Sequence, residues 1–252
     1  MPHRLRLDGA RTDLLNALLY SILAALGDIA GGALVVWRAG RDRRALAILT
    51  GFGAGFLLAV ALLGMMPHAL ESPGGLVAVL VGYLVVHLTQ HSLTPHFHFG
   101  EETHSEAMVS QGVGVFALVG LLPHSFFDGV AISAGFLESH SLGILIFAGI
   151  LLHKIPTGVS LGSVMLASGN TRARTLAAVA ALGAATVLGA VVTPVVEPIA
   201  HYGLPLAAGV TLYVAASNLI PEAQHERSWL VQGGLFAGVV AFYLVSRLLP
   251  VH

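Results

Sequence analysis

The chain has 252 residues, of which 56% are hydrophobic and only 10% are charged, and its mean hydropathy is +0.83. This composition excludes an ordinary soluble domain and indicates a polytopic helical membrane protein. The net charge of -1 argues against a nucleic-acid partner, which would need a basic face. Because cysteine is absent, a metal site in this chain would have to use histidine, methionine and carboxylates.

Eight apolar runs are long enough to cross a bilayer as helices, which takes about 20 residues each. We therefore predict an all-α polytopic membrane protein in one membrane domain, residues 1–252. The predicted spans are 13–37, 45–68, 74–91, 110–136, 141–168, 174–196, 203–222 and 229–249. Arginines gather in the linkers after spans one, three, five and seven, and this pattern predicts that both termini lie outside.

Span one carries Asp28 among small residues, Gly27 to Gly31, which let helix backbones approach closely. A carboxylate at membrane depth needs a partner or water. Asp28 is therefore either a functional residue or an interfacial residue near a helix end. Dimerisation through such glycine-rich faces stays open.

Spans two and seven end in related sequences, with His68 and Glu71 after Pro67 and with Glu222 after Pro221. The relation predicts that spans one to three and six to eight are opposed repeats around a central pair, a 3+2+3 inverted-repeat bundle typical of transporters. His68 and Glu222 would then be entrance and exit stations, with Asn218 one turn from Glu222. Solvation of the helix ends is the alternative interpretation.

The linker at 91–107 is rich in histidine and glutamate and, by the arginine pattern, cytoplasmic. It is either a solvated loop or a weak, fast-exchanging metal trap, since imidazole and carboxylate groups suit zinc and similar ions. The histidines that could capture metal there are His91, His96, His98 and His104.

The central pair of spans, four and five, carries the pattern H-x-x-x-[DT]-G-V twice, starting at His124 and at His153. In span four the fifth position is Asp128, which lies on the same helix face as His124, about 6 Å further along the axis. Ionisable groups at this depth usually face a bundle interior, find partners and carry function. The repeat predicts one shared polar site between the two spans.

These residues resemble the ZIP family of divalent-metal transporters. The resemblance covers the eight spans, the histidine-rich linker, the patterns H-[SN]-x-x-[DE]-G in span four and H-x-x-P-x-G in span five, and the LIPE ending of span seven. It implies that a divalent ion, with zinc expected, moves into the cytoplasm across a bacterial inner (plasma) membrane. It also implies that spans four and five hold the transport site and that the chain is a transporter without a resident cofactor.

The chain departs from family members that hold two metals, because Ser125, Lys154 and Thr157 stand where those members place further ligands. An ammonium cannot coordinate a metal, and Lys154 could instead pair with Asp128 or replace the second ion. We therefore predict a mononuclear transport site. Its ligands would be His124, Asp128 and His153, with a fourth position open.

The ligand set does not choose among zinc, iron(II), cobalt and manganese. Because histidine must be neutral to bind a cation, the sequence predicts that metal binding weakens as pH falls through the imidazole range. The alternative function is an intramembrane zinc-dependent hydrolase, in which the same ion would activate water. Against that alternative, the sequence lacks H-E-x-x-H, and Lys154 stands where an acid would be needed beside His153.

Overall fold

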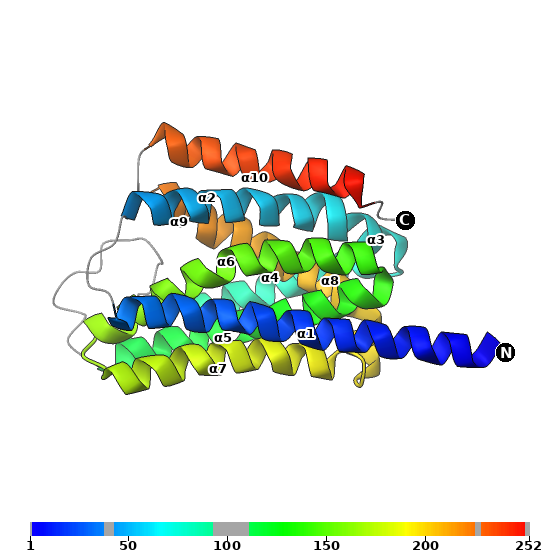
Figure 1. Cartoon of the computed structure of the whole chain (residues 1–252), viewed down its shortest axis with the longest axis horizontal. Helices are drawn as coiled ribbons and strands as arrows, with labels where there is room; N and C mark the ends of the chain where they lie inside the picture. Colours follow the sequence, from blue (N-terminus) through cyan, green and yellow to red (C-terminus); the bar gives the residue numbers. More distant parts are fainter. Residues whose placement is uncertain (1, 38–42, 93–110, 225–227, 250–252) are drawn as a thin grey trace.

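The computed structural model describes residues 2–37, 43–92, 111–224 and 228–249, and within these ranges the chain forms helices and turns with no strand (Figure 1). The predicted metal-capture residues His96, His98 and His104 lie outside the described residues, as does the side chain of His91. In lipid, a helix is one of the few structures that satisfy every backbone polar group internally, so this architecture follows from the hydropathy.

The helices are α1 (Pro2–Trp37), α2 (Arg43–Ala59), α3 (Met66–Glu71), α4 (Gly75–Ser92), α5 (Gln111–Glu138), α6 (His140–Ala167), α7 (Arg172–Val192), α8 (Glu197–Tyr213), α9 (Ile220–Gln224) and α10 (Trp229–Leu248). In the described part of the chain, seven helical stretches are long and apolar enough to cross a membrane, and 75–90 forms a shorter apolar helix. The predicted all-helical membrane fold is confirmed.

Two of these stretches contain a π-helical segment at matching places. The segment η1 (Val60–Met65) joins α2 to α3, and η3 (Val214–Leu219) joins α8 to α9. Each ends two residues before a proline, Pro67 or Pro221, which lacks the backbone donor that a regular helix would use. The wider π turns therefore fall where the helical hydrogen-bond ladder is interrupted.

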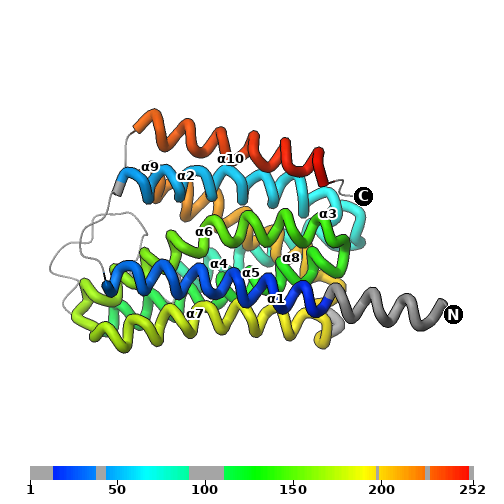
Figure 2. Tube along the Cα trace, in the orientation of Figure 1, coloured from blue at the N-terminus to red at the C-terminus, as the bar shows by residue number. Residues whose placement is uncertain are grey.

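The helices are grouped around α5 and α6. Each of α1, α5, α6 and α7 contacts the other three, so these four form a closed group. Outside this group α2 packs with α10 and α4 packs with α8. Figure 2 shows α10 alongside α2 at the outer edge of the bundle. The four-helix group carries most of the polar side chains described below.

Glycines allow the helices of this group to touch through their backbones. A Cβ atom on Gly158 of α6 would overlap the carbonyl oxygen of Asp28, and one on Gly129 of α5 would overlap that of Thr186. Side chains at these positions would push α1 and α7 away from the centre of the bundle. The glycines therefore fix how close Asp28 and Thr186 come to α5 and α6.

Replacing Gly129 by alanine is expected to lower the free energy of unfolding by about 1 to 3 kcal/mol, the usual cost of overpacking. Thermal unfolding of the purified protein in detergent measures the effect. Gly233→Ala in α10 is the matched control, because a Cβ there meets nothing within 4 Å. Equal melting temperatures for the two variants would contradict the packing argument.

Candidate metal centre

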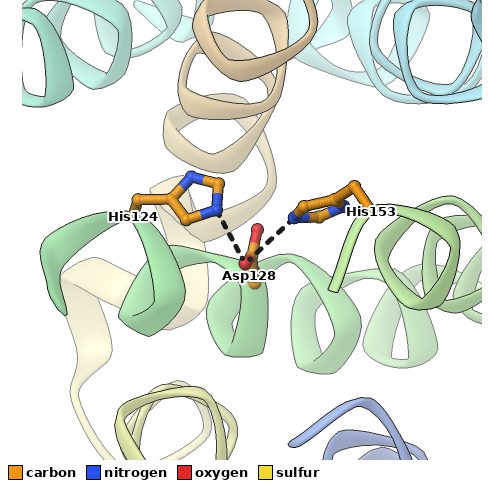
Figure 3. Close-up of side chains that lie close together, drawn as sticks. All are labelled: His124, Asp128 and His153. Carbon is orange, nitrogen blue, oxygen red and sulfur yellow. Dashed lines mark ion pairs between the residues drawn. The ribbon is translucent and has the colours of Figure 1, made fainter. Parts of the chain in front are cut away.

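Three buried side chains from α5 and α6 meet in the middle of the bundle (Figure 3). The carboxylate oxygen Oδ2 of Asp128 lies 3.3 Å from Nε2 of His124 and 3.4 Å from Nε2 of His153. The candidate ligand atoms of the three residues all lie within 4.8 Å of one another. The two imidazoles that sequence analysis paired therefore face the same carboxylate.

The tautomer of His153 follows from its surroundings. Its Nδ1 lies 3.3 Å from the carbonyl oxygen of Gly149, and because a carbonyl only accepts, Nδ1 must donate the proton. The lone pair of Nε2 then points at the carboxylate of Asp128. Among the described residues that Nε2 has no hydrogen-bond partner, and Oδ2 of Asp128 is ion-paired with Lys154. A buried imidazole lone pair that faces a carboxylate oxygen can be satisfied by a cation bound between them.

The distances from the Asp128 oxygen to the two imidazole nitrogens suit a tetrahedral ion. Zinc binds imidazole nitrogen and carboxylate oxygen at about 2.0 to 2.2 Å, so ligand atoms on neighbouring corners are about 3.3 to 3.5 Å apart. The two separations from Asp128, 3.3 and 3.4 Å, match such edges. Two nitrogens and one oxygen leave a fourth corner open for exchange.

The ammonium of Lys154 is fully buried beside this centre, inside a shell of oxygen atoms. Its Nζ lies 3.0 Å from Oδ2 of Asp128 and 3.0 Å from Oδ2 of Asp28 on α1. It also donates to Oγ of Ser125 at 3.1 Å and to Oγ1 of Thr186 at 2.8 Å. The predicted pairing of Lys154 with Asp128 is present in the structure.

Asp28 is buried in the bundle and paired with Lys154, so it is not an interfacial residue near a helix end. Sequence analysis missed Thr186. The available signal was weak, since a threonine within an apolar span usually bonds to its own helix. Only the packing of α7 against α5 and α6 brings its hydroxyl to the ammonium.

A small cavity of about 20 Å³ lies between His124 of this centre and residues of α6, η3 and α9. That is about the room one water molecule needs. His124 of the centre and the half-buried Glu222 both line it. Thr157 also lines it, although its hydroxyl donates to the His153 carbonyl at 2.9 Å. The lining residues are Leu121, His124, Thr157, Ser160, Val214, Asn218, Leu219 and Glu222.

The amide of Asn218, which sequence analysis placed on the exit path, is held in position by α4. It donates to the side-chain oxygen of Gln90 at 3.0 Å. One residue earlier, Oγ of Ser217 lies 3.1 Å from the Tyr83 hydroxyl. The π-helical segment η3 is therefore attached to α4 at the point where it lines the cavity.

His68 does not join the centre; it lies at the end of the bundle where α5 ends. Its Nδ1 is 3.5 Å from a carboxylate oxygen of Glu138 on α5. Glu71, three residues after His68, is exposed. The side chain of Glu138 is about half exposed, at 49%. The pair offers one imidazole and one carboxylate at the opposite end from Glu222.

Comparisons with known proteins agree with these observations. The family described as "ZIP Zinc transporter" matches residues 87–246, more than half of the chain. The protein "Zinc transporter ZupT" of Enterobacter sp. (strain 638) is 31% identical over 222 residues, which cover 82% of this chain and 86% of that protein. The similarity therefore extends over most of both chains.

Proposed function

This chain belongs to the ZIP family of zinc transporters, and from that membership we propose that it carries zinc, one ion at a time, into the cytoplasm. The family comprises transporters rather than enzymes, which argues against the hydrolase alternative. We place the transport site at His124, Asp128 and His153. The observation that carries this proposal is the buried lone pair of His153, which faces the same carboxylate oxygen of Asp128 that His124 contacts.

The restriction to one ion rests on Lys154. The oxygen atoms of Asp28, Asp128, Ser125 and Thr186 would suit a second cation, but the ammonium already lies within 3.1 Å of all of them. A divalent ion at that place would need to displace a buried positive charge. A mononuclear site is therefore the stoichiometry that the geometry supports.

The path we propose runs from His68, Glu71 and Glu138 at one end to Asn218 and Glu222 at the other. Support comes from the His68–Glu138 pair and from the cavity that both His124 and Glu222 line. With the arginine-rich linkers inside, the Glu222 end is cytoplasmic and both termini lie outside. By analogy with its bacterial relative, the chain would serve in a bacterial inner membrane.

An inverted repeat is part of this proposal, and the helix contacts support it. The proposed repeat relates α1 to α7, α2 to α8, α4 to α10 and α5 to α6. Under this relation the pair α1/α6 corresponds to α7/α5, and the pair α2/α10 corresponds to α8/α4. All four pairs are in contact. The same relation turns η1 into η3. It also turns the contact of Gly158 with Asp28 into that of Gly129 with Thr186.

Glu222→Gln is expected to slow zinc uptake about 10-fold while leaving zinc binding at the centre within about 2-fold, because it removes a charge from the path and leaves the ligands intact. Uptake into liposomes and calorimetric binding to the same preparation measure the two quantities. Gln232→Ala, on the partly exposed face of α10, is the control. A loss of binding as large as the loss of uptake would contradict an exit role.

The proposed function is tested with the purified chain in liposomes that contain a zinc-sensing dye. Zinc added outside should raise the internal signal above that of protein-free liposomes, and His153→Ala should remove the rise. Manganese, iron(II) and cobalt in parallel establish the preference. A wild-type rate equal to that of empty liposomes for every ion would overturn the proposal.

A further inference from the structure

We propose that Asp28 is a positioning residue of the transport centre: when a divalent cation binds Asp128, Asp28 retains the ammonium that Asp128 gives up. The inference rests on the proposed function and adds to it a role for α1, which contributes no metal ligand. Lys154 would then stay charge-paired in both states: with Asp28 and Asp128 when the centre is empty, and with Asp28 alone when a cation is bound.

The first observation is the number of acceptors around Lys154. An ammonium has three N–H donors, whereas four oxygen atoms lie within 3.1 Å of its nitrogen. The bond to Asp128 can therefore be lost while every donor still has a partner. The three that remain are Asp28, Ser125 and Thr186.

The second observation is the crowding at Oδ2 of Asp128. Nε2 of His124, Nε2 of His153 and Nζ of Lys154 lie 3.3, 3.4 and 3.0 Å from this one oxygen. A divalent cation bound to it would repel the ammonium and compete for the same lone pairs. Occupation of the centre therefore displaces Lys154 from Asp128.

The third observation gives the direction of that displacement. Of the remaining acceptors only Asp28 is charged, since Ser125 and Thr186 offer neutral hydroxyls. Asp28 is fully buried, and its Oδ1 has no hydrogen-bond partner among the described residues, so it can accept a further donor. The ammonium therefore moves towards α1.

The backbone contact between α1 and α6 keeps Asp28 within reach. A Cβ atom on Gly31, one turn after Asp28, would overlap the carbonyl oxygen of Ile155, and Gly158 abuts the carbonyl of Asp28 itself. Asp28 thus lies against the helix that carries Lys154. It can hold the ammonium without movement of α1.

The test is calorimetric zinc binding to the full-length chain in lipid nanodiscs. Asp28→Asn should weaken binding about 10-fold or more, because the cation must then leave a buried ammonium with neutral partners only. Asp28→Asn combined with Lys154→Met removes both charges and frees Asp128. The double variant should recover zinc binding to within about 3-fold of the wild type or bind more tightly, since the competing ammonium is removed together with its counter-ion.

Ser21→Ala is the control, because Ser21 is equally buried on α1, two helical turns from Asp28, and should bind like the wild type. Thermal unfolding without metal verifies that each variant is folded.

Wild-type affinity for Asp28→Asn would overturn the proposal. Weak zinc binding by the double variant would also overturn it, because Asp28 would then be a direct ligand or a purely structural residue. Failure of the proposed function is distinguishable, since the wild type itself would then not bind zinc.

Discussion

Asp128→Asn is expected to lower zinc uptake by about 100-fold or more. Loss of a group that hydrogen-bonds to a metal ligand typically lowers metal affinity or activity by about 10- to 100-fold, and loss of the ligand itself should have a larger effect. The variant keeps the shape of the side chain but removes the anion that His124, His153 and Lys154 share. Lys154 retains Asp28 as its counter-ion, so the fold should persist. The measurement is zinc influx into dye-loaded liposomes.

Ser133→Ala is the matched control for Asp128→Asn. Ser133 is on the same helix, is fully buried, and its hydroxyl has no hydrogen-bond partner among the described residues. Its uptake should equal that of the wild type. If Asp128→Asn carried zinc within about 3-fold of the wild-type rate, the carboxylate would not be the ligand that the centre requires.

Lys154→Met is expected to lower the free energy of unfolding of the metal-free protein by about 3 to 5 kcal/mol, the usual cost of removing one partner from a buried charge group. Asp28 and Asp128 would then share a buried site without a cation between them. Zinc should restore much of the loss, because a ligand that binds only the folded state stabilises it. Melting temperatures with chelator and with zinc measure both effects.

Arg247→Met is the control for Lys154→Met. Arg247 lies on the exposed face of α10, 5.2 Å over the Tyr243 ring, and its loss should change the free energy of unfolding by no more than about 0.5 kcal/mol. The chelator-treated Lys154→Met protein should therefore melt well below this control. If the two melted together, Lys154 would not compensate the carboxylates.

The helical fold and the His124–Asp128–His153 group were predictable because both depend on local patterns. Hydropathy marks the spans, since helices satisfy their own backbone in lipid, and a spacing of four residues places His124 and Asp128 on one face. The repeat of this pattern at His153 indicated a shared site. The structure brings these three residues together as the pattern predicted.

The shell around Lys154 was only partly predictable, because it depends on how distant helices rotate against one another. The described part of α1 is apolar on most sides, so periodicity does not reveal that Asp28 faces α6. For the same reason, periodicity does not reveal which helix Thr186 of α7 faces. The π-helical segments also lack a compositional signal, apart from the prolines at 67 and 221 that follow them.

All the charged and hydroxyl groups bonded around Lys154 belong to α1, α5, α6 and α7, as do the three candidate ligands. Every one of those electrostatic contacts is thus internal to a single group of helices. If these four helices slid as a rigid body along α2, α4, α8 and α10, no ion pair of the centre would break. The barrier to such a shear would come from apolar side chains repacking at the boundary, together with the His68–Glu138 pair at its rim.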